Sequence, residues 1–167
     1  SNLEKERLLT AIINVKHHFP DIIISVDTYN ASIAKSCIKN GADIINDISA
    51  GEEDKEMWAV VAEFGVTYIM MHMKGKPENM QENPQYDNVT NDIMVFFEKK
   101  IKNLKEKGIE QIIIDPGFGF GKTMEHNYEI LNNLERFQKF GLPLLVGVSR
   151  KSMIYNLLDT DLRQDAR

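Results

Sequence analysis

The stretch from Ile112 to Lys122 reads I-I-I-D-P-G-F-G-F-G-K, and a later stretch from Leu144 to Ser152 reads L-L-V-G-V-S-R-K-S. Each begins as an apolar run and stops abruptly at polar residues and glycines. Apolar runs without apolar/polar alternation are typical of strands buried on both faces of a parallel sheet. The first stretch places a carboxylate, Asp115, where its strand ends, and the second places two cations and two hydroxyls at the matching position. Together they predict a pocket built from strand ends.

Strand-like and helix-like segments alternate along the whole chain. The predicted strands are Ile22–Asp27, Asp43–Ile48, Val66–His72, Gln111–Asp115 and Leu144–Val148. Apolar residues at three- and four-residue spacing predict helices over Leu3–His18, Ala31–Asn40, Lys55–Phe64, Thr90–Lys107 and Glu125–Phe140. Four of these helices are followed by a glycine able to close a helix in the left-handed conformation, namely Gly41, Gly65, Gly108 and Gly141. Repeated helix–glycine–strand units predict an α/β fold made of βα repeats.

Two architectures fit these repeats, a doubly wound open sheet and part of a (β/α)₈ TIM barrel. Open sheets gather their ligand at one switch point, whereas barrels gather it from many strand ends. Polar residues follow every predicted strand, which favours the barrel: Asp27, Asn46, Asp47, His72, Asp115, Ser149, Arg150 and Lys151. A complete barrel has roughly 250 residues. We therefore expect residues 1–167 to form a single partial domain with about five of the eight βα units, open strand edges and a half-exposed apolar interior.

The bulk composition narrows the classes of partner. The 167 residues are 43% hydrophobic and carry a net charge of −5, which argues against nucleic acid or an anionic membrane as a partner. A single cysteine, Cys37, excludes an intrachain disulfide and favours a reducing, cytoplasmic compartment. No apolar run approaches the roughly 20 residues of a membrane-spanning helix. Because Ser1 replaces an initiator Met, we expect the chain to be processed, engineered or recorded only in part.

The glycine-rich run after Asp115 invites comparison with phosphate-binding loops. A Walker A loop requires a glycine five positions before Gly121, where Pro116 stands instead, and the G-x-G-x-x-G dinucleotide pattern does not match either. Alternating glycine and phenylalanine better suits a loop that passes close to a flat ligand and sets an aromatic ring against it.

Asp27 and Asp115 each close an apolar strand. A carboxylate there can accept two hydrogen bonds from an amidine-like edge, N–H beside NH₂, as on guanine or a pterin. A helix cap or turn is the alternative, and it is stronger for Asp27 because Thr28 and Asn30 also resemble capping residues. Asn46 can read a lactam or ring-nitrogen edge, or serve a turn.

Ser149–Ser152 closes the last predicted strand and opens a helix. This position predicts an anion site, with a solvated basic turn as the alternative.

His72 has no second histidine at metal-ligand spacing, so a structural or substrate-edge role is expected. The segment Lys74–Asp87 contains Gly75, Pro77 and Pro84 without periodicity, which predicts a long mobile loop.

The ordered motifs S-V-D-T-Y, I-N-D-I, M-M-H-M, D-P-G-F-G-F-G-K and G-V-S-R-K-S resemble those of the dihydropteroate synthase family. The resemblance runs from about Ile24 to Leu158. It implies a (β/α)₈ barrel that joins p-aminobenzoate to 6-hydroxymethyl-7,8-dihydropterin diphosphate, giving 7,8-dihydropteroate and diphosphate for folate synthesis. It further implies a cytoplasmic homodimeric transferase, sensitive in the family to sulfonamides.

The resemblance also implies roles for individual residues. Pterin-binding residues would be Asp27, Asn46, Met71, Asp115, Gly147 and Lys151. The p-aminobenzoate site would be formed by Phe120, Lys151 and Ser152. Asp27, Asp115 and Lys151 would be the catalytic residues, with no protein nucleophile.

The family's Mg²⁺ is implied as a cofactor, but its asparagine ligand lies in an N-V-T-P-D-S-F-S motif that this sequence lacks, so no metal ligand is expected in this chain. The chain as written is then expected to be incomplete for turnover. Two rival functions stay open, a pterin-dependent methyltransferase domain and a non-catalytic pterin-binding fragment.

Overall fold

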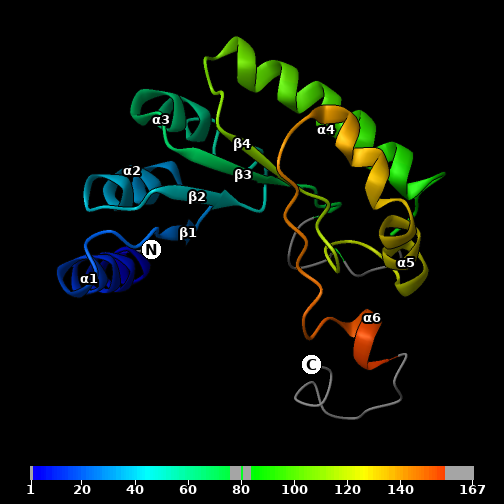
Figure 1. Cartoon of the computed structure of the whole chain (residues 1–167), viewed down its shortest axis with the longest axis horizontal. Helices are drawn as coiled ribbons and strands as arrows, with labels where there is room; N and C mark the ends of the chain where they lie inside the picture. Colours follow the sequence, from blue (N-terminus) through cyan, green and yellow to red (C-terminus); the bar gives the residue numbers. More distant parts are fainter. Residues whose placement is uncertain (1, 76–79, 81–83, 157–167) are drawn as a thin grey trace. The chain divides into compact units, whose positions relative to one another are not determined.

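The computed structural model describes residues 2–75, 80 and 84–156. Much of the loop predicted over Lys74–Asp87, and the tail Asp159–Arg167, to which the sequence assigns no role, lie outside the described residues. The elements alternate between helix and strand through most of the chain (Figure 1). They are α1 (Asn2–His18), β1 (Ser25–Asp27), α2 (Ala31–Lys39), β2 (Ile44–Asp47), α3 (Met57–Phe64), β3 (Thr67–Met71), α4 (Val89–Glu106), β4 (Ile112–Asp115), α5 (Met124–Asn132), the 3₁₀ helix η1 (Leu134–Phe140) and α6 (Ser152–Tyr155). Within these residues, no helix combines the length and apolarity needed to cross a membrane.

The strands form one four-stranded sheet in the sequential order β1-β2-β3-β4. Parallel pairing places Val26 opposite Ile45 and Ile45 opposite Tyr68, so that the strand centres bury apolar side chains. The same register places Asp27 opposite Asn46 and brings the polar strand ends to one edge of the sheet. Parallel strands that follow one another in sequence order, with helices between them, confirm the βα repeats predicted from the sequence.

Two of the four glycines predicted to close helices do so as C-caps, whereas α2 is capped by Asn40, the residue before Gly41. Gly65 and Gly141 occupy the left-handed region as C-caps of α3 and η1, with φ of 63° and 62°. The predicted helix over residues 125–140, however, divides at Asn133. There the side-chain Nδ2 donates to the Glu129 carbonyl at 2.7 Å and the backbone leaves the helical region, so the chain continues as a 3₁₀ helix.

The prediction of a strand over residues 144–148 is wrong. Only Leu144 pairs, in a single parallel bridge with Ile114. Leu145 and Val146 are 37% and 38% exposed, so this segment lacks the burial that its apolar sequence indicated. A strand with one partner and open apolar faces gains too little from burial to extend its ladder.

The described chain divides into two compact units. Unit 1 contains Ser1–Met71 with Lys100–Ile113, and unit 2 contains His72–Lys99 with Ile114–Arg167. Both units are discontinuous in sequence, because α4 and β4 each pass from one unit into the other.

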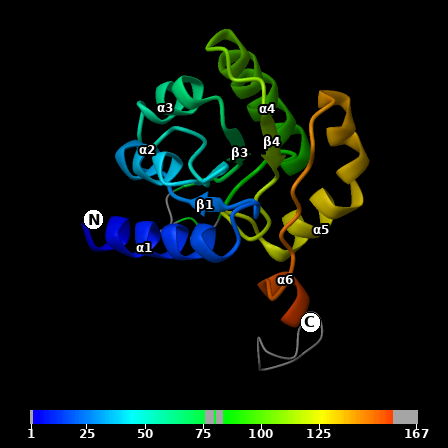
Figure 2. The same ribbon diagram turned by 60° about the vertical axis from the view of Figure 1, so that its left-hand side comes forward.

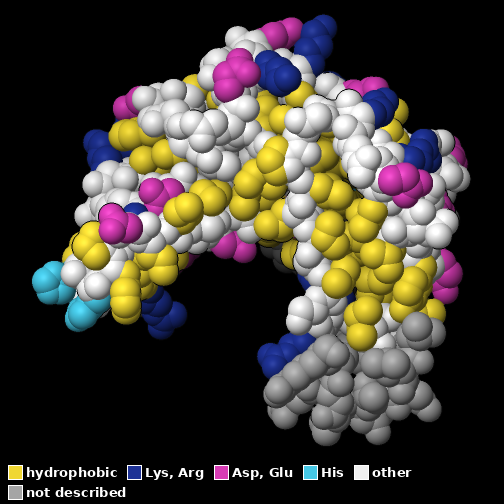
Figure 3. Space-filling model, viewed as in Figure 1, with side chains coloured by type: hydrophobic (Ala, Val, Ile, Leu, Met, Phe, Trp, Pro, Cys, Tyr) yellow, Lys and Arg dark blue, Asp and Glu magenta, His cyan; other side chains and the backbone are white. Residues whose placement is uncertain are grey.

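Unit 1 buries its strands against the helices that connect them. Its core includes Ile45, Met57, Tyr68 and Met70, all 0% exposed, and α2 packs between α1 and α3 (Figure 2). Apolar side chains remain exposed on α1 and on the segment that enters β1 (Figure 3). They are Leu3, Ile13, Val15, Phe19, Ile22 and Ile23. The half-exposed apolar surface expected from the sequence is therefore present in this unit.

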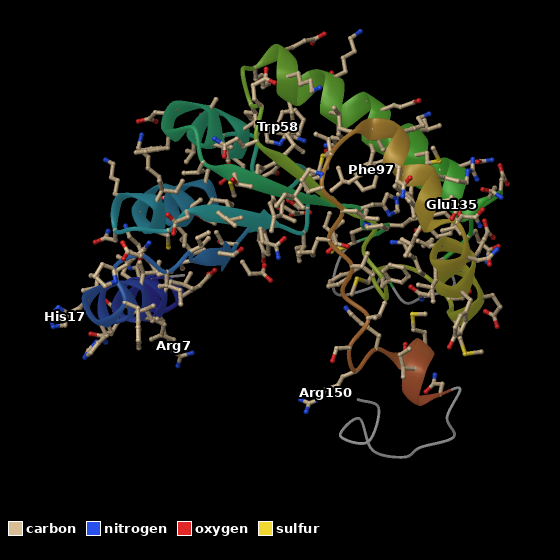
Figure 4. The ribbon with its side chains drawn as sticks, in the orientation of Figure 1. Arg7, His17, Trp58, Phe97, Glu135 and Arg150 are labelled. Atoms are coloured by element: carbon tan, nitrogen blue, oxygen red, sulfur yellow. The ribbon has the colours of Figure 1, made fainter. Side chains whose placement is uncertain are left out.

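Unit 2 is organised around aromatic rings. Phe97, which is labelled in Figure 4, is buried and meets the rings of Phe137 and Phe140 edge-on, with centroids 6.0 and 6.1 Å away. Phe118 and Ile130 are buried in the same unit. Edge-to-face aromatic contacts stabilise such a core beyond the area that they bury.

Candidate functional site

Two polar side chains stand next to each other at the carboxyl end of the sheet in unit 1. Asp27 ends β1 and is paired in register with Asn46 of β2. Asp27 is exposed and Asn46 is half-buried. The Asn46 Oδ1 atom is buried and has no hydrogen-bond partner among the described residues. A buried acceptor without a partner is costly, and it favours a ligand that donates a hydrogen bond there.

The helix-capping alternative for Asp27 is excluded by the structure. Asn30 is the N-cap of α2, and its Oδ1 accepts the amide of Ile33 at 3.0 Å. Partial burial and the nearby charge of Asp47 raise the pKa of Asp27 above its ordinary value. A carboxylate that is not used as a cap, with a raised pKa, is available to a ligand with several donors.

The residue after Asn46 has a different role. Asp47 is completely buried, and its carboxylate accepts four hydrogen bonds. The donors are the amide and hydroxyl of Ser49 at 2.8 and 2.7 Å, the Gly51 amide at 2.8 Å and the Tyr68 hydroxyl at 2.7 Å. These bonds fix the loop that follows β2, and hence the backbone that carries Asn46. From the sequence, Asp47 was expected only as one of the polar residues that follow the strands, and its structural role was not predicted.

Lys100 also holds the loop that follows β2. Its side chain is buried, donates to the Ala50 carbonyl at 2.9 Å, pairs with Glu52 and lies over the Trp58 ring 5.0 Å from its centroid. The Trp58 indole N–H donates to the Tyr68 hydroxyl at 3.3 Å, which joins the loop to the Asp47 network. This arrangement explains why a lysine of α4 can be buried.

In unit 2, Asp115 ends β4 as the sequence predicted, and it is only 7% exposed. Its Oδ1 accepts the Gly117 amide at 2.8 Å. Burial raises the pKa of Asp115, whereas this hydrogen bond and the charges of Lys122 and Lys151 lower it. The next helix, α5, is capped by Thr123, so the carboxylate of Asp115 is not a helix cap.

Lys151 lies across the glycine-rich loop. Its Nζ is 4.4 Å from the centroid of the Phe120 ring. A Cβ added at Gly119 would come within 3.3 Å of the Lys151 Cδ, and Gly119 has a φ of 81°. Glycine therefore allows both the left-handed backbone and the close approach of the lysine stem. Burial lowers the pKa of Lys151, and the charge of Asp115 opposes this shift.

The other residues of S-R-K-S and the preceding glycine are less enclosed. Ser152 is exposed at the start of α6, and Gly147 is exposed, with no atom within 4 Å of an added Cβ. Arg150 extends away from the ribbon (Figure 4) and has a φ of 54°, which is uncommon for a residue with a side chain. The structure thus brings Lys151 into contact with the loop after β4, whereas Gly147 and Ser152 are exposed.

Lys122 was missed as a site residue, because the sequence raised it only in the comparison with phosphate-binding loops. It is 3% exposed, and its Nζ donates to the carbonyls of Gly117 and Phe120 at 2.9 Å each and to that of His72 at 3.2 Å. The signal that can identify it is a lysine inside a glycine-rich loop, where buried carbonyls that no helix or strand pairs need another donor.

His72 is buried against aromatic rings. The ring of Phe96 meets it edge-on at 5.0 Å, and its Nδ1 has no hydrogen-bond partner among the described residues. Burial and the charges of Lys122 and Lys74 lower the pKa of His72 well below its ordinary value, so the ring is neutral at pH 7.

Asp27, Asn46 and Met71 belong to unit 1, and Met71 is buried at the end of β3. Asp115, Phe120, Gly147, Lys151 and Ser152 belong to unit 2. The assignment of all these residues to one ligand site stays a prediction.

Polar strand ends on a parallel βα sheet are the arrangement from which barrel enzymes build their sites. All of residues 1–167 match the family described as pterin binding enzyme, and the chain belongs to that family. It is 42% identical over 158 residues to the dihydropteroate synthase of Escherichia coli, a match that covers 93% of this chain and 55% of that protein.

Solved structures extend the likeness to the fold. A structure of Yersinia pestis dihydropteroate synthase with a sulfonamide drug is 38% identical, with a TM-score of 0.94, and is matched over 99% of this chain and 60% of its own. Dihydropteroate synthase from Xanthomonas albilineans in complex with 7,8-dihydropteroate is 30% identical, with a TM-score of 0.88, over 96% of this chain and 58% of its own. The α/β fold is therefore that of part of a (β/α)₈ barrel, and the chain spans little more than half the length of these relatives.

Proposed function

We propose that this chain is part of a dihydropteroate synthase. The enzyme condenses 6-hydroxymethyl-7,8-dihydropterin diphosphate with p-aminobenzoate, giving 7,8-dihydropteroate and diphosphate for folate synthesis. The identity to dihydropteroate synthases supports the assignment. One observation from the structure carries it: in unit 2 the Lys151 ammonium lies over the Phe120 ring, with its charge coupled to the Asp115 carboxylate. A carboxylate, an aromatic face and a cation are what a donor-rich pterin and an aromatic acid require.

The pterin has a donor-rich edge that carboxylates and amides recognise. In this proposal, Asp115 and Asp27 each accept hydrogen bonds from N–H groups of that edge, and Asn46 offers the buried Oδ1 that has no protein donor among the described residues. Met71 and Gly147 line the faces of the ring. An apolar side chain and a glycine permit the close, flat contact that an aromatic heterocycle makes.

The aromatic acid has a flat ring and a carboxylate. Phe120 would form a wall for the ring, and Lys151 would border both substrates. Ser152, the first residue of α6, would receive the carboxylate through its hydroxyl group. Sulfonamide binding by the Yersinia pestis relative supports an aminobenzoate-like ligand for this chain.

The chemistry needs no protein nucleophile. In the proposed step, the bond between the pterin's exocyclic methylene carbon and the diphosphate oxygen breaks, and diphosphate leaves with the electron pair. The methylene carbon becomes cationic, the arylamine nitrogen forms the new C–N bond, and that nitrogen then loses a proton to solvent. Ionised Asp27 and Asp115 favour the cation electrostatically, and the Gly117 amide favours the ionised form of Asp115.

The Mg²⁺ implied by the family remains a proposal. The residues that the structure describes contain no group of three or more His, Cys, Asp or Glu side chains that could hold a metal ion. Magnesium is often bound through one or two protein ligands together with substrate phosphates, so such a group is not required.

The homodimer and the cytoplasmic location expected from the resemblance remain proposals, as does the single domain. That neither nucleic acid nor a membrane is a partner also remains a proposal.

Ligand binding by the 167-residue chain tests the function. We expect isothermal titration to show binding of 6-hydroxymethyl-7,8-dihydropterin diphosphate, and p-aminobenzoate to bind when pterin and diphosphate are present. Asp115→Asn should weaken pterin binding about tenfold or more, because a neutral amide replaces a charged acceptor. Asp21→Asn, a change at an exposed carboxylate, is the matched control. Pterin binding without any p-aminobenzoate binding would favour the methyltransferase rival, and equal affinity in Asp115→Asn would contradict the edge-pairing role.

A further inference from the structure

The loop after β4 is organised by a buried ammonium group. Lys122 is one of the few charged side chains buried among the described residues, at 3% exposed. In its charged form Nζ has three protons, and three carbonyl oxygens accept them: those of Gly117, Phe120 and His72. All four residues lie in unit 2. The number of donors equals the number of acceptors, so the ammonium is satisfied without solvent.

These three carbonyls come from two segments. His72 directly follows β3, and Gly117 and Phe120 lie in the loop after β4. The Gly117 peptide is held from both sides, because its amide donates to Asp115 and its carbonyl accepts from Lys122. Lys122 therefore fixes the turn that orients the Asp115 carboxylate.

The turn is held at further points. The Gly119 amide donates to the Asn127 Oδ1 at 2.8 Å, and the Phe120 amide donates to the Gly117 carbonyl at 3.1 Å. The Tyr86 hydroxyl donates to the Gly121 carbonyl at 2.8 Å. Lys122 donates to the carbonyls of both Gly117 and Phe120, the two residues that set the start of the turn and its aromatic ring.

We propose that Lys122 is a positioning residue that holds the Gly117–Phe120 turn, so that Phe120 faces Lys151 and Asp115 keeps its orientation. This inference rests on the proposed function for its catalytic meaning, since Phe120 and Asp115 are the candidate contacts of the two substrates. Lys122 itself has its three donors occupied by the protein and is not assigned a contact with either substrate. Burial lowers the pKa of Lys122 to about 7, and the charge of Asp115 opposes this shift.

The positioning role predicts a local change when the ammonium is removed. In Lys122→Met, which keeps an unbranched side chain but removes the terminal nitrogen, we expect faster amide hydrogen exchange at Gly117, Gly119 and Phe120, by about tenfold or more. The amides of α5 should exchange as in the wild type. Lys102→Met, at a lysine whose side chain is 76% exposed, is the matched control and should change neither region. Lys122→Arg keeps the charge and should restore part of the protection.

Ligand titrations separate positioning from simple stability. Lys122→Met should weaken p-aminobenzoate binding about tenfold, and Lys122→Arg about threefold. Unchanged exchange of the turn in folded Lys122→Met would overturn the inference, as would exchange that rises equally throughout unit 2. If Lys122→Met does not fold, the same comparison with Lys122→Arg decides, and unaltered exchange and affinity in that variant overturn it. If the turn loosens as expected but the wild type binds no p-aminobenzoate, the proposed function fails while the structural role of Lys122 stands.

Discussion

The loops after β2 and β4 are each held by one buried charge, but the two charges have opposite signs. Asp47 in unit 1 is an anion that gathers N–H and O–H donors, whereas Lys122 in unit 2 is a cation that gathers carbonyl oxygens. In both, the hydrogen bonds satisfy the buried group, so that its burial is tolerated. A strand-end loop exposes amides on one side of its turn and carbonyls on the other, and either set can be anchored.

The surroundings of the two charges differ in a way that matters for function. The partners of Asp47 are loop groups and Tyr68, whose pKa is raised well above its ordinary value by burial and by the Asp47 charge. That network serves as scaffold, although the Asp47 charge also raises the pKa of one candidate site residue, Asp27. Lys122 instead has two candidate site residues, Asp115 and Lys151, as its charged neighbours, and its pKa is lowered to about 7. Asp47, the first anchor, should therefore govern stability. Lys122, the second anchor, should also make stability depend on pH.

Removing the Asp47 carboxylate, the first anchor, should give the largest change in the free energy of unfolding. Asp47→Ala leaves the Ser49 and Gly51 amides and the Tyr68 hydroxyl buried without their acceptor. We expect the free energy of unfolding to fall by about 3–5 kcal/mol. Urea unfolding followed by the fluorescence of Trp58, the only tryptophan in the chain, measures this in unit 1.

A surface ion pair provides the control for that loss. Glu63→Ala removes the partner of Lys35, in a pair whose side chains are 53% and 39% exposed. The loss should be no more than about 1 kcal/mol. If Asp47→Ala cost no more than Glu63→Ala, the view of Asp47 as the anchor of its loop would be wrong.

The same comparison shows what the sequence can and cannot reveal. Strand and helix positions followed from apolar periodicity and closing glycines, and Asp27, Asn46 and Asp115 were found because polar residues end buried strands. Lys122 and Asp47 were not assigned their roles, because hydrogen bonds to backbone groups leave no pattern in a single sequence. The strand predicted over residues 144–148 failed for a related reason: apolar composition indicates burial, but burial depends on a neighbour that packs against the segment.

Lys122, the second anchor, should make the free energy of unfolding depend on pH. The folded-state pKa of Lys122, about 7, lies below its ordinary value of 10.5. Between these values the unfolded state binds more protons than the folded state, so the Lys122 contribution to stability rises with pH, by at most about 1.4 kcal/mol per unit. Below pH 7 this contribution is constant. The stability of the wild type relative to Lys122→Met should therefore increase from pH 7 to pH 10, as measured by urea unfolding with circular dichroism.

Three titratable groups face Lys122, and they determine how that measurement is interpreted. Asp115 raises the pKa of Lys122 and Lys151 lowers it, while His72, with its own pKa well below 6.5, is neutral throughout the window. Lys102→Met should track the wild type, because its lysine is exposed on α4. A stability difference between wild type and Lys122→Met that stays flat over this range would show that Lys122 keeps an ordinary pKa, and the contrast between the two anchors would then be one of sign alone.

The smallest effect should come from removing one bond of the Asp47 network while leaving its charge. Tyr68→Phe deletes the hydroxyl that donates to Asp47 and accepts from Trp58, but Asp47 keeps the amide donors of Ser49 and Gly51. We expect a loss of about 1–2 kcal/mol in the free energy of unfolding, without the pH dependence predicted for Lys122. Unfolding curves at pH 7 and pH 9 test both parts. A loss as large as that of Asp47→Ala would mean that the Tyr68 hydroxyl, and not the set of backbone amides, is the main partner of the buried carboxylate, because the remaining donors would then contribute little to holding the loop.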